Sequence, residues 1–334
     1  KDLEIEPTER EKILIEKIVE QLPLFLNSIY NLNIKRNINV DKIHLLKSTP
    51  QWLGEKVVGW LQTTSGDIAV TSSMAVRSER SFSSHLAHEI IHLLSFRRRV
   101  VRREDSGDKT GREIYFLCAN REGLGWLPVG GEEKTLFSIF DEALTEMLAE
   151  FFIQDLEKND EGLRKEKEAT LFIKDWLRSK MIELGIEKEI MEIGRSVATF
   201  ANSIEIADFL KSDKPVEGKI SYVKEHLIDK RNDIVGEPFI QLGYSRQIDW
   251  LNYILRAALA KNLSLPYDSP EVFQKASQLF TKMVKLKFTG TGCLKILREA
   301  RSHLGYKNFK ELVENIGRID SKSEDLPSLD DLTH

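Results

Sequence analysis

The stretch "HLAHEIIHLL" (85–94) sets three histidines and one glutamate in an otherwise apolar run. The apolar spacing around it predicts a helix over about 82–96. His88 and His92 are four residues apart, so a helix places them on one face, one turn from each other. Two imidazoles at that spacing can bind one Zn²⁺ ion at ~2.0–2.1 Å each. A helix that only filled a core would not need these residues, so the stretch indicates a metal site.

Glu89 completes the pattern H-E-x-x-H between the two histidines. Because it is adjacent to His88, the helix turns it about 100° from that ligand. It is therefore expected beside an open coordination position, outside the ligand shell. A carboxylate there can take a proton from water and pass it to a leaving amine, so we predict that Glu89 is a general base. The alternative is a core helix whose two histidines are satisfied by ordinary hydrogen bonds.

A third ligand has to come from elsewhere in the chain. Ser95 and Arg98 stand where the metzincin pattern has Gly and His, which excludes that form. A second helix, expected over about 135–158, carries Glu142 and Glu146 on one face. Since catalytic zinc commonly uses two His and one carboxylate, Glu142 is the predicted third ligand. Glu146 is predicted to hydrogen-bond a zinc-binding histidine. The alternative is an exposed charged helix face.

"HEIIH" followed by "DEALTE" resembles the gluzincins, the thermolysin-like zinc metallopeptidases, whose second motif is N/D-E-x-x-[ST]-[DE]. The resemblance covers about 80–150. It implies a zincin-like fold, one zinc ion and hydrolysis of peptide bonds, with "GDIAVTSSM" (66–74) in the place of the family's edge strand. It also implies the roles given above for each motif residue, in chain order His88, Glu89, His92, Glu142 and Glu146. The family has Asp more often than Glu at the last position.

Peptide hydrolysis also needs a hydrogen-bond donor near the developing oxyanion. Tyr244, in "GYSRQ", is the candidate chosen here, with His226 and Tyr115 as rivals. His85 lies one turn before His88. A packing or hydrogen-bonding role is expected for it, because a fourth protein ligand would close the metal site.

The pattern along the chain predicts an α+β fold followed by helices. Thr8 and Glu11 have capping-box spacing at the start of a first helix. Short apolar stretches bounded by turn residues predict strands at 42–47, 57–64, 66–74 and 112–118. We expect a zincin-like catalytic domain over 1–158 with a small mixed sheet and an active-site helix. A mostly helical domain follows over 159–320, and then an acidic, flexible tail over 321–334.

Charge and composition limit the classes of partner that the sequence predicts. The net charge of −4 argues against nucleic acid and anionic membranes as partners. The partner that the resemblance implies is a peptide or protein substrate. "FRRRVVRRE" (96–104) holds five Arg and could bind phosphate or acidic ligands, but a solvated helix end is the preferred interpretation. Two distant cysteines and a charged first segment favour a cytoplasmic protein. The first residue is not Met, which leaves room for an upstream targeting segment.

The sequence therefore predicts a zinc-dependent metallopeptidase. A metal-binding regulatory or interaction protein without turnover is the alternative, and an intact Glu89 argues against it. A purely structural zinc site is disfavoured because only three good protein ligands are visible.

Overall fold

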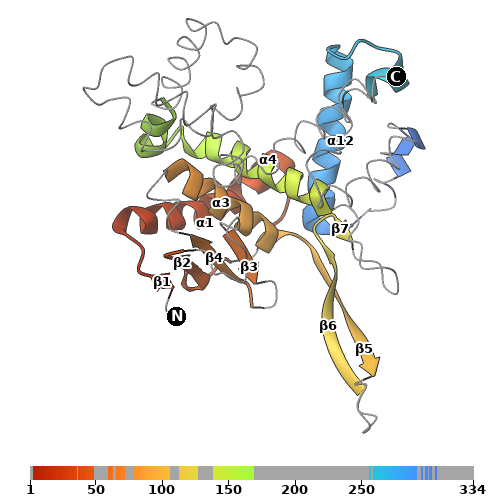
Figure 1. Cartoon of the computed structure of the whole chain (residues 1–334). Coiled ribbons are helices and arrows are strands. Elements are labelled where there is room, and N and C mark those ends of the chain that lie inside the picture. The colour runs from red at the N-terminus through yellow and green to blue at the C-terminus, as the bar shows by residue number, and fades with distance from the viewer. Residues whose placement is uncertain are drawn as a thin grey trace, which may run out of the picture. The chain divides into compact units, whose positions relative to one another are not determined.

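The computed structural model (Figure 1) shows a mixed α and β chain with a small sheet and a larger share of helix, which confirms the predicted class at that level. It describes residues 3–35, 37–48, 59–62, 65–71, 79–105, 113–126, 138–168 and 259–291, with a few single positions beyond these ranges. None of the helices in this described part is both long and apolar enough to cross a membrane.

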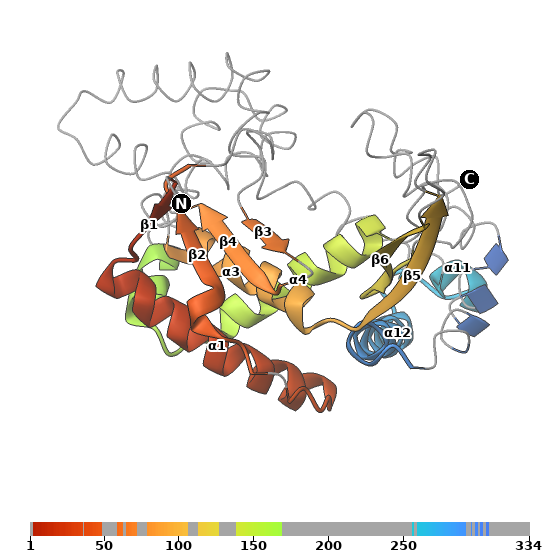
Figure 2. The same ribbon diagram turned by 90° about the horizontal axis from the view of Figure 1, so that it is seen from below.

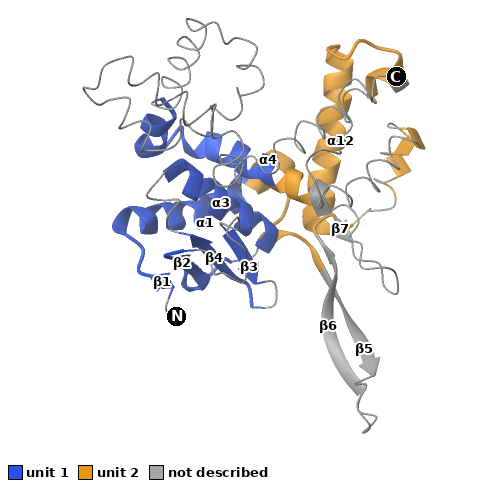
Figure 3. Ribbon diagram, in the orientation of Figure 1, with its two compact units in different colours: residues 1–25, 35–93, 146–245 blue, residues 26–34, 94–145, 246–334 orange. Residues whose placement is uncertain are grey.

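The chain divides into two compact units, each assembled from separate segments (Figure 3). Unit 1 takes residues 1–25, 35–93 and 146–245, and unit 2 takes residues 26–34, 94–145 and 246–334. The domain boundary expected near 158 stays a prediction, because residues 169–255 and the tail after 320 lie outside the described residues.

Unit 1 contains a four-stranded mixed sheet in the order β1-β2-β4-β3. The strands are β1 (Glu4–Ile5), β2 (Ile43–Leu46), β3 (Gly59–Gln62) and β4 (Asp67–Thr71). β4 runs parallel to β2 and antiparallel to β3. The strands predicted at 42–47, 57–64 and 66–74 are confirmed by β2, β3 and β4.

The expectation that the 66–74 segment is an edge strand is wrong. β4 lies inside the sheet and β3 is the edge. The physical reason lies in its consecutive buried residues from Ile68 to Thr71, a pattern typical of a strand that pairs on both sides.

Two helices lie along one face of this sheet, as Figures 1 and 2 both show: α1 (Glu9–Tyr30) and α3 (Glu79–Leu94). The predicted capping box opens α1, where Thr8 N–H donates to Glu11 at 2.6 Å and Glu11 N–H donates to the Thr8 hydroxyl at 3.2 Å. The core of unit 1 is formed by apolar residues of the sheet, α1, α3 and α4 (Ser138–Leu156): Leu14, Ile18, Leu22, Leu45, Ile68, Val70, Phe82, Leu86, Ile90, Phe152 and Ile153. This packing buries most of α3, including His88, whereas Glu89 and His92 keep part of their surface accessible.

Unit 2 holds a three-stranded antiparallel sheet, with β5 (Arg97–Asp105), β6 (Glu113–Glu122) and β7 (Gly125–Trp126). The strand expected at 112–118 is confirmed as part of β6. The interpretation of 96–104 as a helix end is wrong, because α3 stops at Leu94 and the arginine-rich segment is β5. Its pairing with β6, which is rich in β-branched and aromatic residues, explains the extended conformation.

Unit 2 also contains α11 (Leu259–Leu263) and α12 (Pro270–Thr289). Ser269 caps α12, with Pro270 in the first turn. The helix ends at Gly290, which adopts the left-handed conformation at φ 65°.

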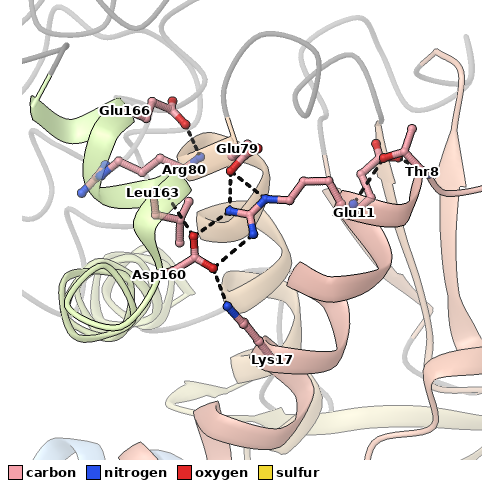
Figure 4. Close-up of polar contacts among 9 residues, drawn as sticks. Thr8, Glu11, Lys17, Glu79, Arg80, Asp160, Leu163 and Glu166 are labelled. Atoms are coloured by element: carbon pink, nitrogen blue, oxygen red, sulfur yellow. Dashed lines mark hydrogen bonds and ion pairs between the residues drawn. The ribbon is translucent and has the colours of Figure 1, made fainter.

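A buried carboxylate ties three segments of unit 1 together (Figure 4). Asp160, which is 2% exposed, accepts from Arg10 and from Lys17 at 2.6 Å each. It also accepts from Leu163 N–H at 3.1 Å and so caps the helical residues 161–168. Arg10 in turn donates to Glu79, the first residue of α3, at 2.6 Å. The start of α3 is thereby linked to α1 and to the chain that leaves α4.

These partners also set the charge state of Asp160. Burial alone would raise its pKa, but the hydrogen bonds from Arg10, Lys17 and the Leu163 amide outweigh burial and hold the pKa well below its usual range. A carboxylate with a lowered folded-state pKa stabilises the fold above its unfolded pKa of about 3.9, and this contribution is lost as the pH falls below that value.

We expect Asp160→Asn to lower the free energy of unfolding by about 2 kcal/mol at pH 7, because charged hydrogen bonds are lost. The difference from the parent should shrink at pH 3, where the unfolded parent gains a proton. Urea denaturation at both pH values measures this. Asp155→Asn is the matched control, since its ion pair with Lys158 is largely exposed and should contribute almost nothing. An equal loss at both pH values would contradict the charge argument.

Candidate metal centre

His88 and His92 face each other from successive turns of α3. Their Nε2 atoms are 3.1 Å apart and their rings meet edge to face. Two ligands at ~2.0–2.1 Å from a tetrahedral zinc ion are separated by about 3.3 Å. The observed separation is close to that value, so both nitrogens can reach one ion without a change of the helix.

Glu146 on α4 orients the first of these histidines. Its Oε2 lies 2.8 Å from Nδ1 of His88, which is 8% exposed. A carboxylate at that distance favours the tautomer with the proton on Nδ1, because that N–H can donate to it. The lone pair of His88 then lies on Nε2, the nitrogen that is 3.1 Å from Nε2 of His92. The hydrogen bond predicted for Glu146 is present, and it prepares His88 as a ligand.

Glu142 lies one turn before Glu146 on the same helix. The ligand atoms of His88, His92 and Glu142 all lie within 4.8 Å of one another, and they form a group that could hold a metal ion. This upper limit is wider than the ~3.3 Å edge of a tetrahedral zinc site. Two imidazoles and one carboxylate are a donor set that suits Zn²⁺ and leaves a position open.

Glu89 lies against the edge strand β3. A β-carbon built on Gly59 would be 2.8 Å from Oε1 of Glu89 and 3.1 Å from its Cγ. Only glycine leaves room there, because real β-carbons do not approach other atoms so closely. The absent side chain at Gly59 therefore creates the space that the Glu89 side chain occupies. Sequence reasoning identified Glu89 but missed Gly59, since nothing in a lone strand glycine indicates a contact with a distant helix.

His85 stands beside the group without joining it. Its Nδ1 lies 2.8 Å from the carbonyl oxygen of Ser81, one turn earlier in α3. Burial lowers the pKa of His85, and this outweighs the charge of Glu146 and the Ser81 carbonyl, which raise it. A neutral imidazole that donates through Nδ1 agrees with the expected hydrogen-bonding role.

The structure does not describe the side chains of the proposed oxyanion donors. Tyr244 and its rival His226 lie outside the described residues. Tyr115 lies in β6, where it pairs in register with Arg103 of β5. The role of all three stays a prediction.

A second buried carboxylate, Asp141, was not assigned a role from the sequence although it opens "DEALTE". Its Oδ1 accepts from Leu124 N–H at 2.7 Å, and its Oδ2 lies 2.7 Å from Nζ of Lys287, which is 0% exposed. The sequence of α12 does indicate that Lys287 is buried. Lys287 lies four residues after the buried Met283 and eleven after the buried Ala276, in phase with an apolar helix face.

A comparison of the chain with protein-family models, with curated proteins and with solved structures finds no match in any of the three.

Proposed function

We propose that the protein is a zinc-dependent metallopeptidase that hydrolyses peptide bonds of a peptide or protein substrate. The observation that carries the proposal is the pair of facing Nε2 atoms on α3, with Glu146 on the outer nitrogen of His88 and Glu142 one turn away. An imidazole in a core needs one hydrogen-bond partner for each nitrogen. Here the two Nε2 atoms are each other's partner at 3.1 Å, and that separation also suits two ligands of one cation.

His88, His92 and Glu142 are the residues that would hold one Zn²⁺ ion. A zinc ion bound there would supply Lewis acidity, which polarises a substrate carbonyl and acidifies water. The α+β part of the chain would then have a zincin-like arrangement, with α3 packed on the mixed sheet and α4 carrying the second motif. This finer fold assignment belongs to the proposal and rests on the resemblance and on the geometry together.

The protein's own residues would transfer the proton, orient His88 and stabilise the oxyanion. Glu89, held beside β3, accepts a proton from the attacking water and returns it to the leaving amine. Glu146 keeps His88 in the tautomer that exposes its Nε2 lone pair. A donor for the developing oxyanion completes the scheme, and Tyr244 is the candidate for it.

The first prediction about the metal centre concerns zinc binding. We expect about one zinc per chain in the parent and none in His92→Ala, because one of three ligands is lost. Glu146→Ala should keep zinc but bind it ~10–100-fold more weakly, as happens when the partner of a ligand is removed. Elemental analysis and competition with a chromogenic chelator measure both. Unchanged zinc in His92→Ala would show that the ligand assignment is wrong.

The second prediction separates an enzyme from a binding protein. Glu89→Gln keeps the size of the side chain but cannot accept a proton, so zinc content should be unchanged. Hydrolysis should fall by ~10²–10⁴-fold, the usual loss without general acid–base catalysis. The measurement is digestion of unfolded casein and a quenched peptide library, with and without chelator.

Two outcomes would count against this assignment. Chelator-sensitive cleavage that persists undiminished in Glu89→Gln would exclude Glu89 as the base. A zinc-loaded parent that cleaves no peptide would favour the alternative, a metal-binding regulatory protein without turnover.

The third prediction uses Gly59. A methyl group in Gly59→Ala must push the Glu89 carboxylate away from β3, since its Oε1 lies only 2.8 Å from that position. A displacement of this size should lower kcat by roughly 10- to 100-fold while zinc affinity stays at the parent value. In the Glu89→Gln background the same change should cost nothing further, because the two residues act as one unit. Additive losses would show that Gly59 acts on something other than the base.

A further inference from the structure

A buried ion pair joins the second motif to the last long helix of unit 2. Nζ of Lys287 on α12 lies 2.7 Å from Oδ2 of Asp141 on α4, and both side chains are 5% exposed or less. The other carboxylate oxygen of Asp141 accepts from Leu124 N–H at 2.7 Å. Both oxygens of Asp141 are therefore used by groups outside its own helix.

The backbone around this pair is tied into the same cluster. Phe96 N–H donates to the carbonyl of Lys287 at 2.9 Å, and Gly123 N–H donates to the carbonyl of Phe96 at 2.8 Å. Gly123 has φ 54°, and a β-carbon there would lie 2.4 Å from Oδ1 of Asp141. The end of α12, the turn before β7 and the first turn of α4 are thus held by one set of contacts around Asp141.

A buried ion pair is a poor way to gain stability, because removing two charges from water costs about as much as their attraction returns. Well-packed apolar residues of the same volume would serve as well or better. What an ion pair adds is direction, since the carboxylate has to meet a particular ammonium and a particular N–H group. Asp141 lies in the first turn of α4, and the next residue is Glu142.

We propose that Lys287 is a positioning residue of the metal centre: through Asp141 it fixes the rotation of the first turn of α4 and so directs Glu142 toward the two histidines. This inference rests on the proposed zinc function. Successive residues on a helix are separated by about 100°, so a turn of α4 about its axis moves Asp141 and Glu142 together. Glu146, four residues further along α4, is already anchored on His88. With Asp141 and Glu146 both held in place, α4 cannot turn about its axis, and the direction in which Glu142 leaves the helix is set.

The experiment measures the zinc dissociation constant of the full chain by chelator competition, together with the thermal midpoint of the metal-free protein. We expect Lys287→Met to bind zinc ~10–100-fold more weakly than the parent, in the range seen when the support of a ligand is lost. Lys282→Met on the same helix is the matched control, because its ion pair with Glu299 is partly exposed, and its zinc affinity should equal that of the parent. Glu146→Ala is the positive control for a lost ligand support.

Lys287→Met leaves a buried carboxylate unpaired and could fail to fold for that reason alone. The double variant Asp141→Asn/Lys287→Met removes both charges, and the Asn oxygen still accepts from Leu124 N–H. We expect it to fold with a metal-free thermal midpoint near that of the parent, but to bind zinc at least ~10-fold more weakly. A purely structural pair would shift the thermal midpoint and leave zinc affinity unchanged.

Each remaining outcome decides the matter. Zinc affinity within ~2-fold of the parent in the folded double variant overturns the positioning role and leaves the zinc proposal intact. If neither variant folds, the ion pair serves stability, and the positioning role of Lys287 is overturned. A parent chain that binds no zinc overturns the zinc proposal and this inference together.

Discussion

The hydrogen bond between His88 and Glu146 is the interaction on which the candidate site depends. It joins α3 to α4 at 2.8 Å and fixes which nitrogen of His88 carries the proton. Without it, the imidazole could turn or change tautomer, and the facing pair of Nε2 atoms would have no reason to persist. The same contact sets where α4 lies along α3, so Glu142, one turn earlier, approaches the histidines as a consequence of helix geometry. One carboxylate thereby prepares one ligand and places another.

Ionic contacts also join the start of α3 to α4 and to the chain that follows α4. Arg80, at the start of α3, donates to Glu150 and to Glu157, the latter at 2.6 Å, and its backbone N–H donates to Glu166 at 3.0 Å. Such contacts contribute direction more than net free energy, since desolvation cancels much of their attraction. Apolar residues supply the stability, with Leu86 and Ile90 fully buried on the other face of α3. Directional ionic contacts on a stable apolar core suit a metal site, because the ligands of a metal must be held to within a fraction of an ångström.

Much of the local structure could be predicted because its causes are local. The capping box of Thr8 and Glu11, the Ser269 cap and the spacing of His88 and His92 each involve residues within four positions of one another. The predictions were wrong where contacts with distant segments determine the local structure. β4 is internal because β2 and β3 pair on its two sides, and the arginine-rich segment is a strand because β6 pairs with it. The buried run in β4 agrees with pairing on both sides, but the residues of neither segment identify the strands that pair with it.

The candidate site shows the same limit in its supporting residues. H-E-x-x-H and the following D-E-x-x-T-E indicate the groups proposed to do chemistry, because short spacings on a helix define a face. Gly59 and Lys287 are 30 and 145 positions from the motif residues they serve, Glu89 and Glu142, and neither residue type suggests such a role by itself. Gly59 leaves space for the Glu89 side chain, and Lys287 pairs with Asp141, the residue before the proposed ligand Glu142. A motif therefore specifies which atoms react, and the fold specifies where they are held.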